Sequence, residues 1–326
     1  MLVRNSSYND SMLGRRSAMT AASAQPFLKS SRTRRLWSVL WIGFAFLAIL
    51  LACILLYNNY SFRSQSRSQF NAQLDGALER ATVWIVAHPE LSLRNPSIMY
   101  MIDMAKMSGD PRLQQLLYEY SQRLQHPSDA LDLFWVRITD RHFPLPLIAA
   151  PELGDAGNER FWDAYALSPG NLQISNADRA DLFSPTKYTW GTCHHQLLAL
   201  VMYRDFNGDN PELHSVINHL SEKIARDAHF DFRVSDSYIQ RTTFVLAAGR
   251  PDLIRGRWVE RIVDNQMPDG SWKYCWHGWC HGIVEFNLTN PGHPTVQAAW
   301  AYAGRGEQWI KEGEQAVKTT RLSRHC

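Results

Sequence analysis

Apolar residues after position 74 recur mostly at intervals of three and four, as in helices that bury one face. The clearest stripe is Leu213, Val216, Ile217, Leu220 and Ile224. Further helices are predicted near 75–87, 97–107, 111–125, 128–138, 192–205, 236–248, 253–265, 295–304 and 306–317, with prolines at several joints. The proline-rich segment 142–190 has no clear period, and a long irregular segment in a compact domain is usually functional or a lid. We therefore predict a mainly α fold for residues 74–320.

A second pattern precedes this domain. Residues 36–57 carry no charge, and at 1.5 Å per residue such a helix spans the roughly 30 Å hydrocarbon core of a bilayer. Trp37, Trp41 and Tyr57 stand where interfacial aromatics belong. No small-residue cleavage site follows the segment, which predicts an uncleaved signal anchor that crosses the membrane once. The Ser/Gln/Asn-rich residues 58–73 are expected to form a stalk or a helical extension of the anchor.

Charge sets the expected orientation of this anchor. The chain holds 34 basic and 31 acidic residues, a net charge of +3, yet residues 1–35 alone carry seven bases and one acid. This basic tail outweighs Arg63 and Arg67 beyond the membrane segment, so the N-terminus is expected in the cytoplasm and the domain outside. We expect a bacterial inner-membrane protein with a periplasmic domain, although the acid-poor tail is also compatible with an organelle presequence.

Composition excludes several classes of protein. Five cysteines in 326 residues exclude a small disulfide scaffold, and 45% hydrophobic residues exclude a wholly disordered chain. The basic excess lies in the tail and is no argument for nucleic-acid binding, so no nucleic acid is expected as a partner. Neither a phosphate-binding Gly-rich loop nor a Gly-x-Ser-x-Gly nucleophile motif is present in the sequence.

A weak internal repeat refines the fold class. With an offset of about 42 residues, Val216, Ile217 and Leu220 align with Trp258, Val259 and Ile262, which is typical of repeated helical hairpins. Such hairpins bury their apolar stripes against neighbours in either a solenoid or a closed ring.

The segment that follows the second hairpin favours the ring. Gln266, Asp269, Gly270 and Trp272 in the sequence QMPDGSW resemble the Gln-x-x-Asp-Gly-x-Trp turn of the α/α toroids, the fold of terpenoid cyclases and protein prenyltransferases. The sequence HPTVQAAWAYA from His293 also resembles the helix after that turn. In such a turn the glycine permits a tight bend, the aspartate caps backbone amides and the tryptophan covers a helix end. The resemblance covers about 190–310 and implies an α/α toroid without implying a reaction.

In a ring of alternating inner and outer helices, those at 192–205, 236–248 and 295–304 are the inner ones, and their N-termini face one mouth. His194, Asp236 and His293 stand at these N-termini and are the candidate catalytic residues. The possible carboxylate pair Asp236 and Asp269 also suits helix capping or turn formation. Trp190, Tyr238, Arg241, Trp276 and Trp279 are the candidate substrate-binding residues, with the tryptophans able either to stack on a sugar or to plug the fold.

Cysteines and histidines are expected at the same mouth. Thiolates and imidazoles at close spacing suit zinc, and the candidate ligands are Cys193, Cys275, Cys280 and His281. The sequence WCHG at 279–282 resembles the Cys-His-Gly zinc motif of lanthipeptide cyclases, which are themselves α/α toroids. Two other interpretations stay open: a disulfide between Cys275 and Cys280, or thiols and histidines that only pack.

Two functions are compatible with this sequence. The first is an enzyme that modifies an envelope glycan or peptide, with a zinc or thiol site at the mouth of the toroid. The second is a non-enzymatic module that binds an envelope partner and is stapled by a disulfide. The cofactor is undetermined, with zinc as the candidate.

Overall fold

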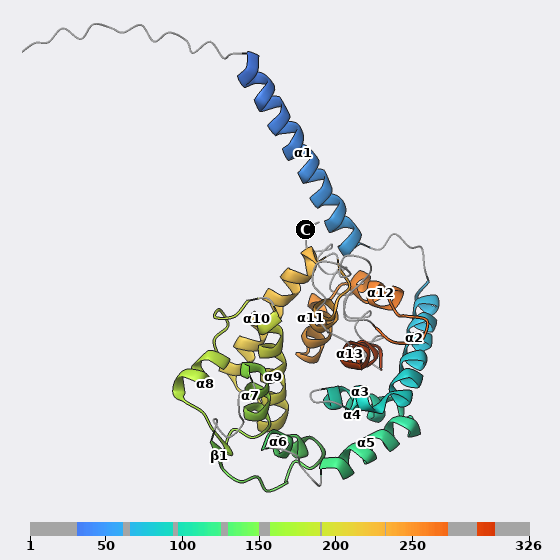
Figure 1. The fold of residues 1–326 in the computed structure, drawn as a ribbon, viewed down its shortest axis with the longest axis vertical. Coiled ribbons are helices and arrows are strands. Elements are labelled where there is room, and N and C mark those ends of the chain that lie inside the picture. Colours follow the sequence, from blue (N-terminus) through green and yellow to red (C-terminus); the bar gives the residue numbers. More distant parts are fainter. Residues whose placement is uncertain are drawn as a thin grey trace, which may run out of the picture. The chain divides into compact units, whose positions relative to one another are not determined.

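A computed structural model describes residues 31–60, 66–93, 97–124, 130–149, 157–189, 191–231, 233–272 and 292–303. These residues form a mainly helical structure with one two-stranded parallel pair, β1 and β2 (Figure 1). The elements are α1 (Ser31–Asn59), α2 (Arg67–Ala87), α3 (Pro89–Ser92), α4 (Ser97–Ser108), α5 (Pro111–Leu124), α6 (Ala130–Thr139), β1 (Ile148–Ala149), α7 (Gly157–Leu167), β2 (Leu172–Gln173), α8 (Asn176–Leu182), α9 (Gly191–Asn207), α10 (Pro211–Phe230), α11 (Asp236–Ala247), η2 (Pro251–Leu253), α12 (Gly256–Asp264) and α13 (Gly292–Tyr302).

The hydrophobic period located these helices well. All five residues of the stripe that begins at Leu213 are buried on α10. The helix itself begins at Pro211, directly after the N-cap Asn210. The predicted helix 306–317 lies outside the described residues. The ambiguous segment 142–190 contains α7 and α8. Residues 162–167 of α7 are all buried, so this part of the helix has no exposed face from which a period could be recognised.

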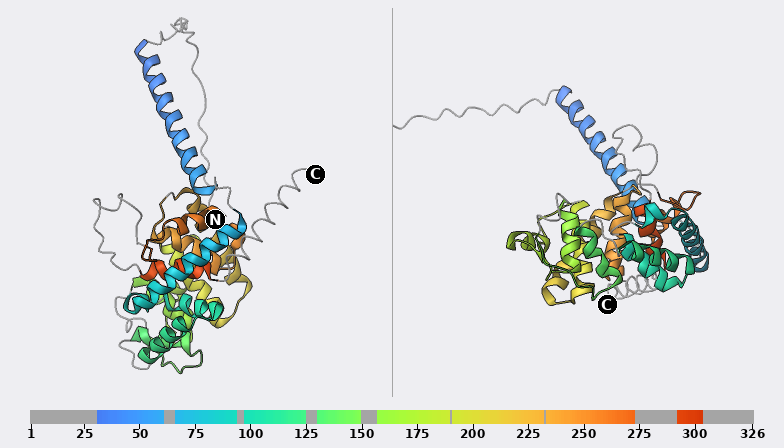
Figure 2. Two further views of the ribbon diagram at one scale, coloured as in Figure 1. Left: turned by 90° about the vertical axis from the view of Figure 1, so that its right-hand side faces the viewer. Right: turned by 60° about the horizontal axis from the view of Figure 1, so that its bottom comes forward.

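Helices that are neighbours in sequence pack against one another through most of the domain. Contacts run from α4 through α5, α6, α7, α9, α10 and α11 to α13. The last of these, α13, also contacts α4 and α2, so the end of the described domain packs against its beginning. In Figure 2, α2 lies along the outside of the helical assembly.

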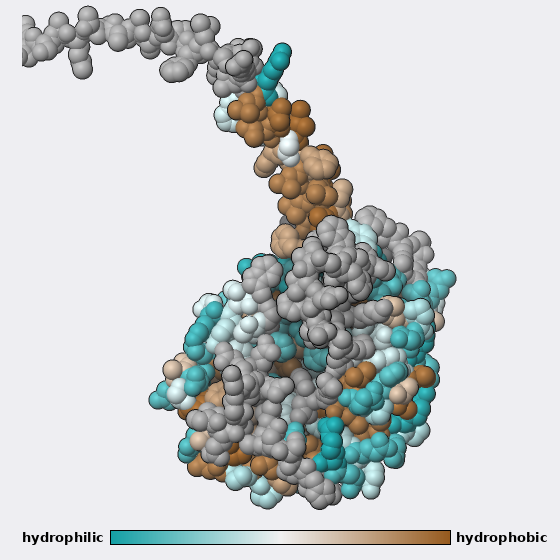
Figure 3. Space-filling view, in the orientation of Figure 1, coloured by the Kyte–Doolittle hydropathy of each residue, from teal (hydrophilic) through white to brown (hydrophobic). Residues whose placement is uncertain are grey.

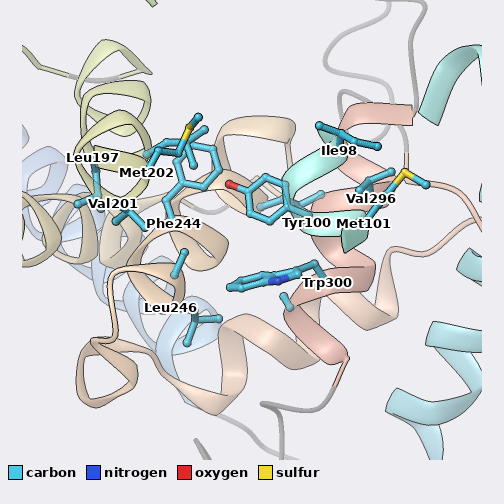
Figure 4. Close-up of a cluster of buried hydrophobic side chains, with 14 of the residues drawn as sticks. Ile98, Tyr100, Met101, Leu197, Val201, Met202, Phe244, Leu246, Val296 and Trp300 are labelled. Atoms are coloured by element: carbon cyan, nitrogen blue, oxygen red, sulfur yellow. The ribbon is translucent and has the colours of Figure 1, made fainter. Parts of the chain in front are cut away.

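Buried apolar side chains meet between α4, α9, α11 and α13 (Figure 4). The Tyr100 ring stacks parallel to Phe244 with centroids 6.2 Å apart, and it meets Trp300 edge-on at 5.3 Å. Leu197 and Val296 close the cluster from α9 and α13, and both are fully buried. The centre of this part of the domain is therefore filled by side chains.

The turn at 266–272 has the roles expected from its sequence. Gly270 adopts a φ of +94°, and Asp269 accepts hydrogen bonds from the backbone and hydroxyl of Ser271. The Trp272 indole is buried and donates to the carbonyl of Ile262 in the last turn of α12, at 2.7 Å. Gln266 donates to the carbonyl of Ala77 at 2.8 Å, so the turn also joins α12 to α2.

The first helix differs in character from the others. The part of α1 from residue 35 to residue 59 is long and apolar enough to cross a membrane. None of its most apolar 18-residue stretch is buried. Figure 3 shows hydrophobic side chains over the visible face of this helix. Residues 1–50 and 51–326 form two separate units, and the last turns of α1 belong to the second. Asn58 and Asn59, assigned to a stalk by their sequence, are buried in that unit.

Candidate functional site

Polar side chains from near the N-termini of three helices, α4, α11 and α13, meet at one place. Gln240 of α11 donates from Nε2 to Oδ2 of Asp236 at 2.9 Å and contacts Nε2 of His293 on α13 at 3.1 Å. The other ring nitrogen of His293, Nδ1, lies 3.3 Å from the hydroxyl of Ser97 on α4. Gln297 also contacts His293 Nε2, at 2.9 Å. Two of the three candidate catalytic residues, Asp236 and His293, are thus joined through one amide group.

The third candidate, His194 of α9, is held by an arginine. Its Nε2 accepts a hydrogen bond from Nε of Arg241 on α11 at 3.1 Å. The Nη1 group of Arg241 donates to Oδ2 of Asp231, the C-cap residue of α10. Arg233 donates to the other oxygen of Asp231 at 3.3 Å. The positive charge of Arg241 is therefore paired in the folded protein.

Asp236 has the properties of an acid/base group. Burial raises the pKa of Asp236 to about 7, and the nearby charge of His195 opposes this rise. Its Oδ1 atom is buried and has no hydrogen-bond partner among the described residues. The carboxyl group therefore titrates near neutral pH with one oxygen uncommitted, a combination that is common among catalytic acids.

His194 is neutral at physiological pH. Burial lowers the pKa of His194 to about 3, and the charges of Arg241 and His195 lower it further. Because Nε2 accepts from Arg241, the ring proton resides on Nδ1. This Nδ1 group is buried and makes no hydrogen bond within the described part of the chain, although the Gln240 side chain lies near enough to His194 to oppose the fall in its pKa. His194 is therefore a neutral hydrogen-bond donor.

Cys193 precedes His194 but differs from a reactive thiolate. Its side chain is fully buried, and burial raises the pKa of the Cys193 thiol to about 11. Among the residues that the structure describes, no three His, Cys, Asp or Glu side chains converge as metal ligands. The other candidate ligands, Cys275, Cys280 and His281, lie outside the described residues, so zinc and the disulfide both remain predictions.

The candidate substrate-binding residues divide in the same way. Tyr238 and Arg241 are almost fully buried and bonded to the protein's own groups, Tyr238 to Asn58 and Arg241 to His194 and Asp231. These two side chains therefore hold neighbouring residues in place and are not exposed to a ligand. Trp190, Trp276 and Trp279 lie outside the described residues.

Sequence reasoning missed several members of this cluster. Gln240 and Gln297 stand four residues after Asp236 and His293, on the same helix faces, so the i to i+4 spacing contained a signal for both. Ser97 and Asp231 carried no such signal, because long-range packing brings them to the site.

The comparisons assign no relative to this arrangement: no protein-family model, curated protein or solved structure matches the chain.

Proposed function

We propose that this chain is a membrane-anchored enzyme whose helical domain cleaves an envelope glycan by acid/base catalysis, with Asp236 as the acid. The observation that carries the proposal is the buried Asp236 carboxyl, whose pKa is about 7 and whose Oδ1 atom has no partner among the described residues. A group kept in this state costs stability, and such costs are concentrated at functional sites.

An α/α toroid is the architecture proposed for the domain. Its support is the order of helix contacts, which leads from α4 along the sequence to α13 and back to α4. The resemblance of the 266–272 turn to that of the toroids agrees with this order. In such a ring the apolar centre would be closed by Tyr100, Phe244 and Trp300, leaving the polar cluster at the helix N-termini as the place for chemistry.

The anchor is proposed to remain attached, with the N-terminus in the cytoplasm and the domain outside. Its support is the length and apolar surface of α1, together with the basic tail before it. Contacts at its end agree, because Asn59 donates to the carbonyl of Leu55 and Arg257 donates to that of Tyr57. Cleavage within the apolar segment would remove these groups.

The proposed reaction is hydrolysis. Protonated Asp236 gives its proton to the leaving oxygen as the glycosidic bond breaks, and water supplies a hydroxyl group to the carbon. The remaining proton of water returns to Asp236, which restores its acid form. His194 donates from Nδ1 to a substrate oxygen, and His293 holds Gln240 against Asp236. General acid catalysis of this kind contributes about 10² to 10⁴ in rate.

The test uses the full-length protein in detergent with two envelope glycans, purified murein sacculi and a total glycolipid extract, and products from each are measured by mass spectrometry. Asp236→Asn is expected to lose about 10²-fold or more in rate, because the amide cannot give up a proton. Asp75→Asn is the matched control, since Asp75 is an exposed aspartate on α2. Glycan release that is equal in wild type and Asp236→Asn, or absent in wild type, would overturn the proposal. Release of peptides alone would assign an amidase instead.

A further inference from the structure

The last residues of α1 are part of the domain's hydrogen-bonded interior. Asn58 donates from Nδ2 to the carbonyls of Ala228 and His229 at 2.7 and 2.8 Å. These carbonyls belong to the last turn of α10, where the helix provides few further donors. Ala228 also accepts the backbone N–H of the C-cap residue Asp231, at 3.4 Å. Asn59 accepts from the Trp258 indole at 3.1 Å. Both asparagines are buried, so this end of the anchor is fixed to α10 and α12.

The same asparagine reaches the supports of the candidate site. Oδ1 of Asn58 accepts from the hydroxyl of Tyr238 at 3.3 Å and from Nη1 of Arg261. Arg261 also donates to the backbone carbonyl of Asp231 at 3.3 Å, and the carboxylate of Asp231 binds Arg241. A short series of contacting side chains therefore links the end of the anchor to His194.

These contacts limit the distance between the membrane and the site. Tyr238 touches Asn58 and lies two helical residues after Asp236, so Asp236 is on the order of 10–15 Å from the end of the anchor. The apolar run ends at Tyr57, which places Asn58 at the edge of the hydrocarbon core. The head-group layer beyond that edge is about 5–8 Å thick. The site therefore lies at or just above the lipid head groups, whatever the tilt of α1.

Side chains around the end of the anchor suit this level of a bilayer. Tyr57, Tyr60 and Phe230 are exposed. Phe230 follows His229, whose carbonyl accepts from Asn58 and Asn59. Arg255 lies over the Tyr60 ring and Arg257 over the Tyr57 ring, at 5.9 and 5.3 Å. Exposed aromatic residues combined with arginine are typical of the membrane interface.

The chemistry of the site indicates the kind of head group. His293 contacts the amides of Gln240 and Gln297 and the hydroxyl of Ser97. Asp236 is half protonated near pH 7, and Arg241 is paired with Asp231. The amides of Gln240 and Gln297 are buried among these groups, and the arginine of the cluster is committed to Asp231. Polar, uncharged partners of this kind match the hydroxyl and acetamido groups of a sugar better than a phosphate, which selects arginine or lysine.

From these observations we infer that the substrate is a glycolipid, whose neutral sugar head group enters the site while its tail stays in the bilayer. This inference rests on the proposed function, and it adds that the glycan is held in the membrane.

Photocrosslinking tests the location of the site. In the full-length protein, Phe230→p-benzoylphenylalanine and Tyr118→p-benzoylphenylalanine replace one exposed aromatic residue by another of similar shape. Phe230 precedes Asp231, whereas Tyr118 lies on α5, on the side of the domain away from the end of α1 (Figure 1). In vesicles of phosphatidylethanolamine and phosphatidylglycerol, lipid adducts are expected at position 230 and not at 118. Equal yields at the two positions, or no adduct at 230, would overturn the inference.

Hydrolysis of two matched glycosides tests the substrate class. The hexadecyl and methyl glycosides of the same N-acetylglucosamine disaccharide are supplied at equal concentration to the protein in those vesicles. The hexadecyl glycoside is expected to be cleaved about tenfold faster or more, because the membrane concentrates it at the site. Equal rates that Asp236→Asn abolishes would overturn the glycolipid inference and leave the acid/base function intact. Cleavage unaffected by Asp236→Asn, or cleavage of neither glycoside, would overturn both.

Discussion

The turn at Gly270 allows a sharp test of how the domain is closed. A Cβ atom at this position would lie 2.2 Å from the carbonyl oxygen of Arg80 and 2.7 Å from its carbonyl carbon, both in the backbone of α2. The residue also has a φ of +94°, which L side chains rarely adopt. Gly270→Ala therefore adds backbone strain of about 1–2 kcal/mol and an overlap that costs about 1–3 kcal/mol more.

Gly208 is a matched control for the strain. It has nearly the same φ, +93°, and a Cβ built there meets nothing within 4 Å. Gly208→Ala is therefore expected to cost only the strain, less the 0.4–1 kcal/mol or so that alanine returns by restricting the unfolded chain. This entropic gain applies to both variants and cancels in their difference.

The assay is denaturant unfolding of the full-length protein in detergent, followed by tryptophan fluorescence. Gly270→Ala is expected to lower the free energy of unfolding by about 1–3 kcal/mol more than Gly208→Ala. α2 cannot move away cheaply, because the Gln266 amide bonds to Ala77 in the same helix. Equal losses in the two variants would refute the close approach of the turn to α2.

Two further predictions concern titration and thiol reactivity. As pH rises from about 4 to 7, Asp236 ionises in the unfolded chain while it stays protonated in the fold. The free energy of unfolding therefore falls by on the order of 4 kcal/mol because of this group. The free energy of unfolding of Asp236→Asn, minus that of wild type, should therefore be larger at pH 8 than at pH 4. The same difference at both pH values would contradict this. Because burial raises the pKa of Cys193 to about 11, iodoacetamide at pH 8 should leave its peptide unmodified until the protein is denatured, as measured by mass spectrometry. Alkylation in the native protein would show that this thiol is accessible.

The sequence located elements that have two distinct faces. The stripe on α10 gave its buried side, and Pro111 and Pro211 are the first residues of α5 and α10, as the preference for proline in the first turn predicts. The short elements α3 and η2 were not predicted, because four or three residues are too few for a period. Strands β1 and β2 were missed for the same reason, since each contributes two residues to one pair.

The candidate site was predicted by helix direction more than by residue type. The sequence placed three helix N-termini at one mouth. In the structure the Gln240 amide contacts both Asp236 and His293, and His194 accepts from Arg241 on the same helix as Asp236. The burial of Tyr238 and Arg241 could not be predicted from their residue types. A tyrosine or arginine in a helix looks the same whether it meets a ligand or a distant asparagine, and here the partner lies 180 positions away.

Stability considerations distinguish this cluster from ordinary packing. Three of its buried polar atoms, Nδ1 of His194, Oδ1 of Asp236 and Oε1 of Gln297, have no partner among the described residues. Each buried group of this kind costs about 1–3 kcal/mol, which apolar side chains of the same size would avoid. Elsewhere the same helices meet through apolar contacts such as Tyr100 against Phe244. These polar groups are expensive to bury, lie near helix N-termini and are linked by side-chain contacts to the end of α1. This combination favours the proposal that a ligand completes their hydrogen bonds.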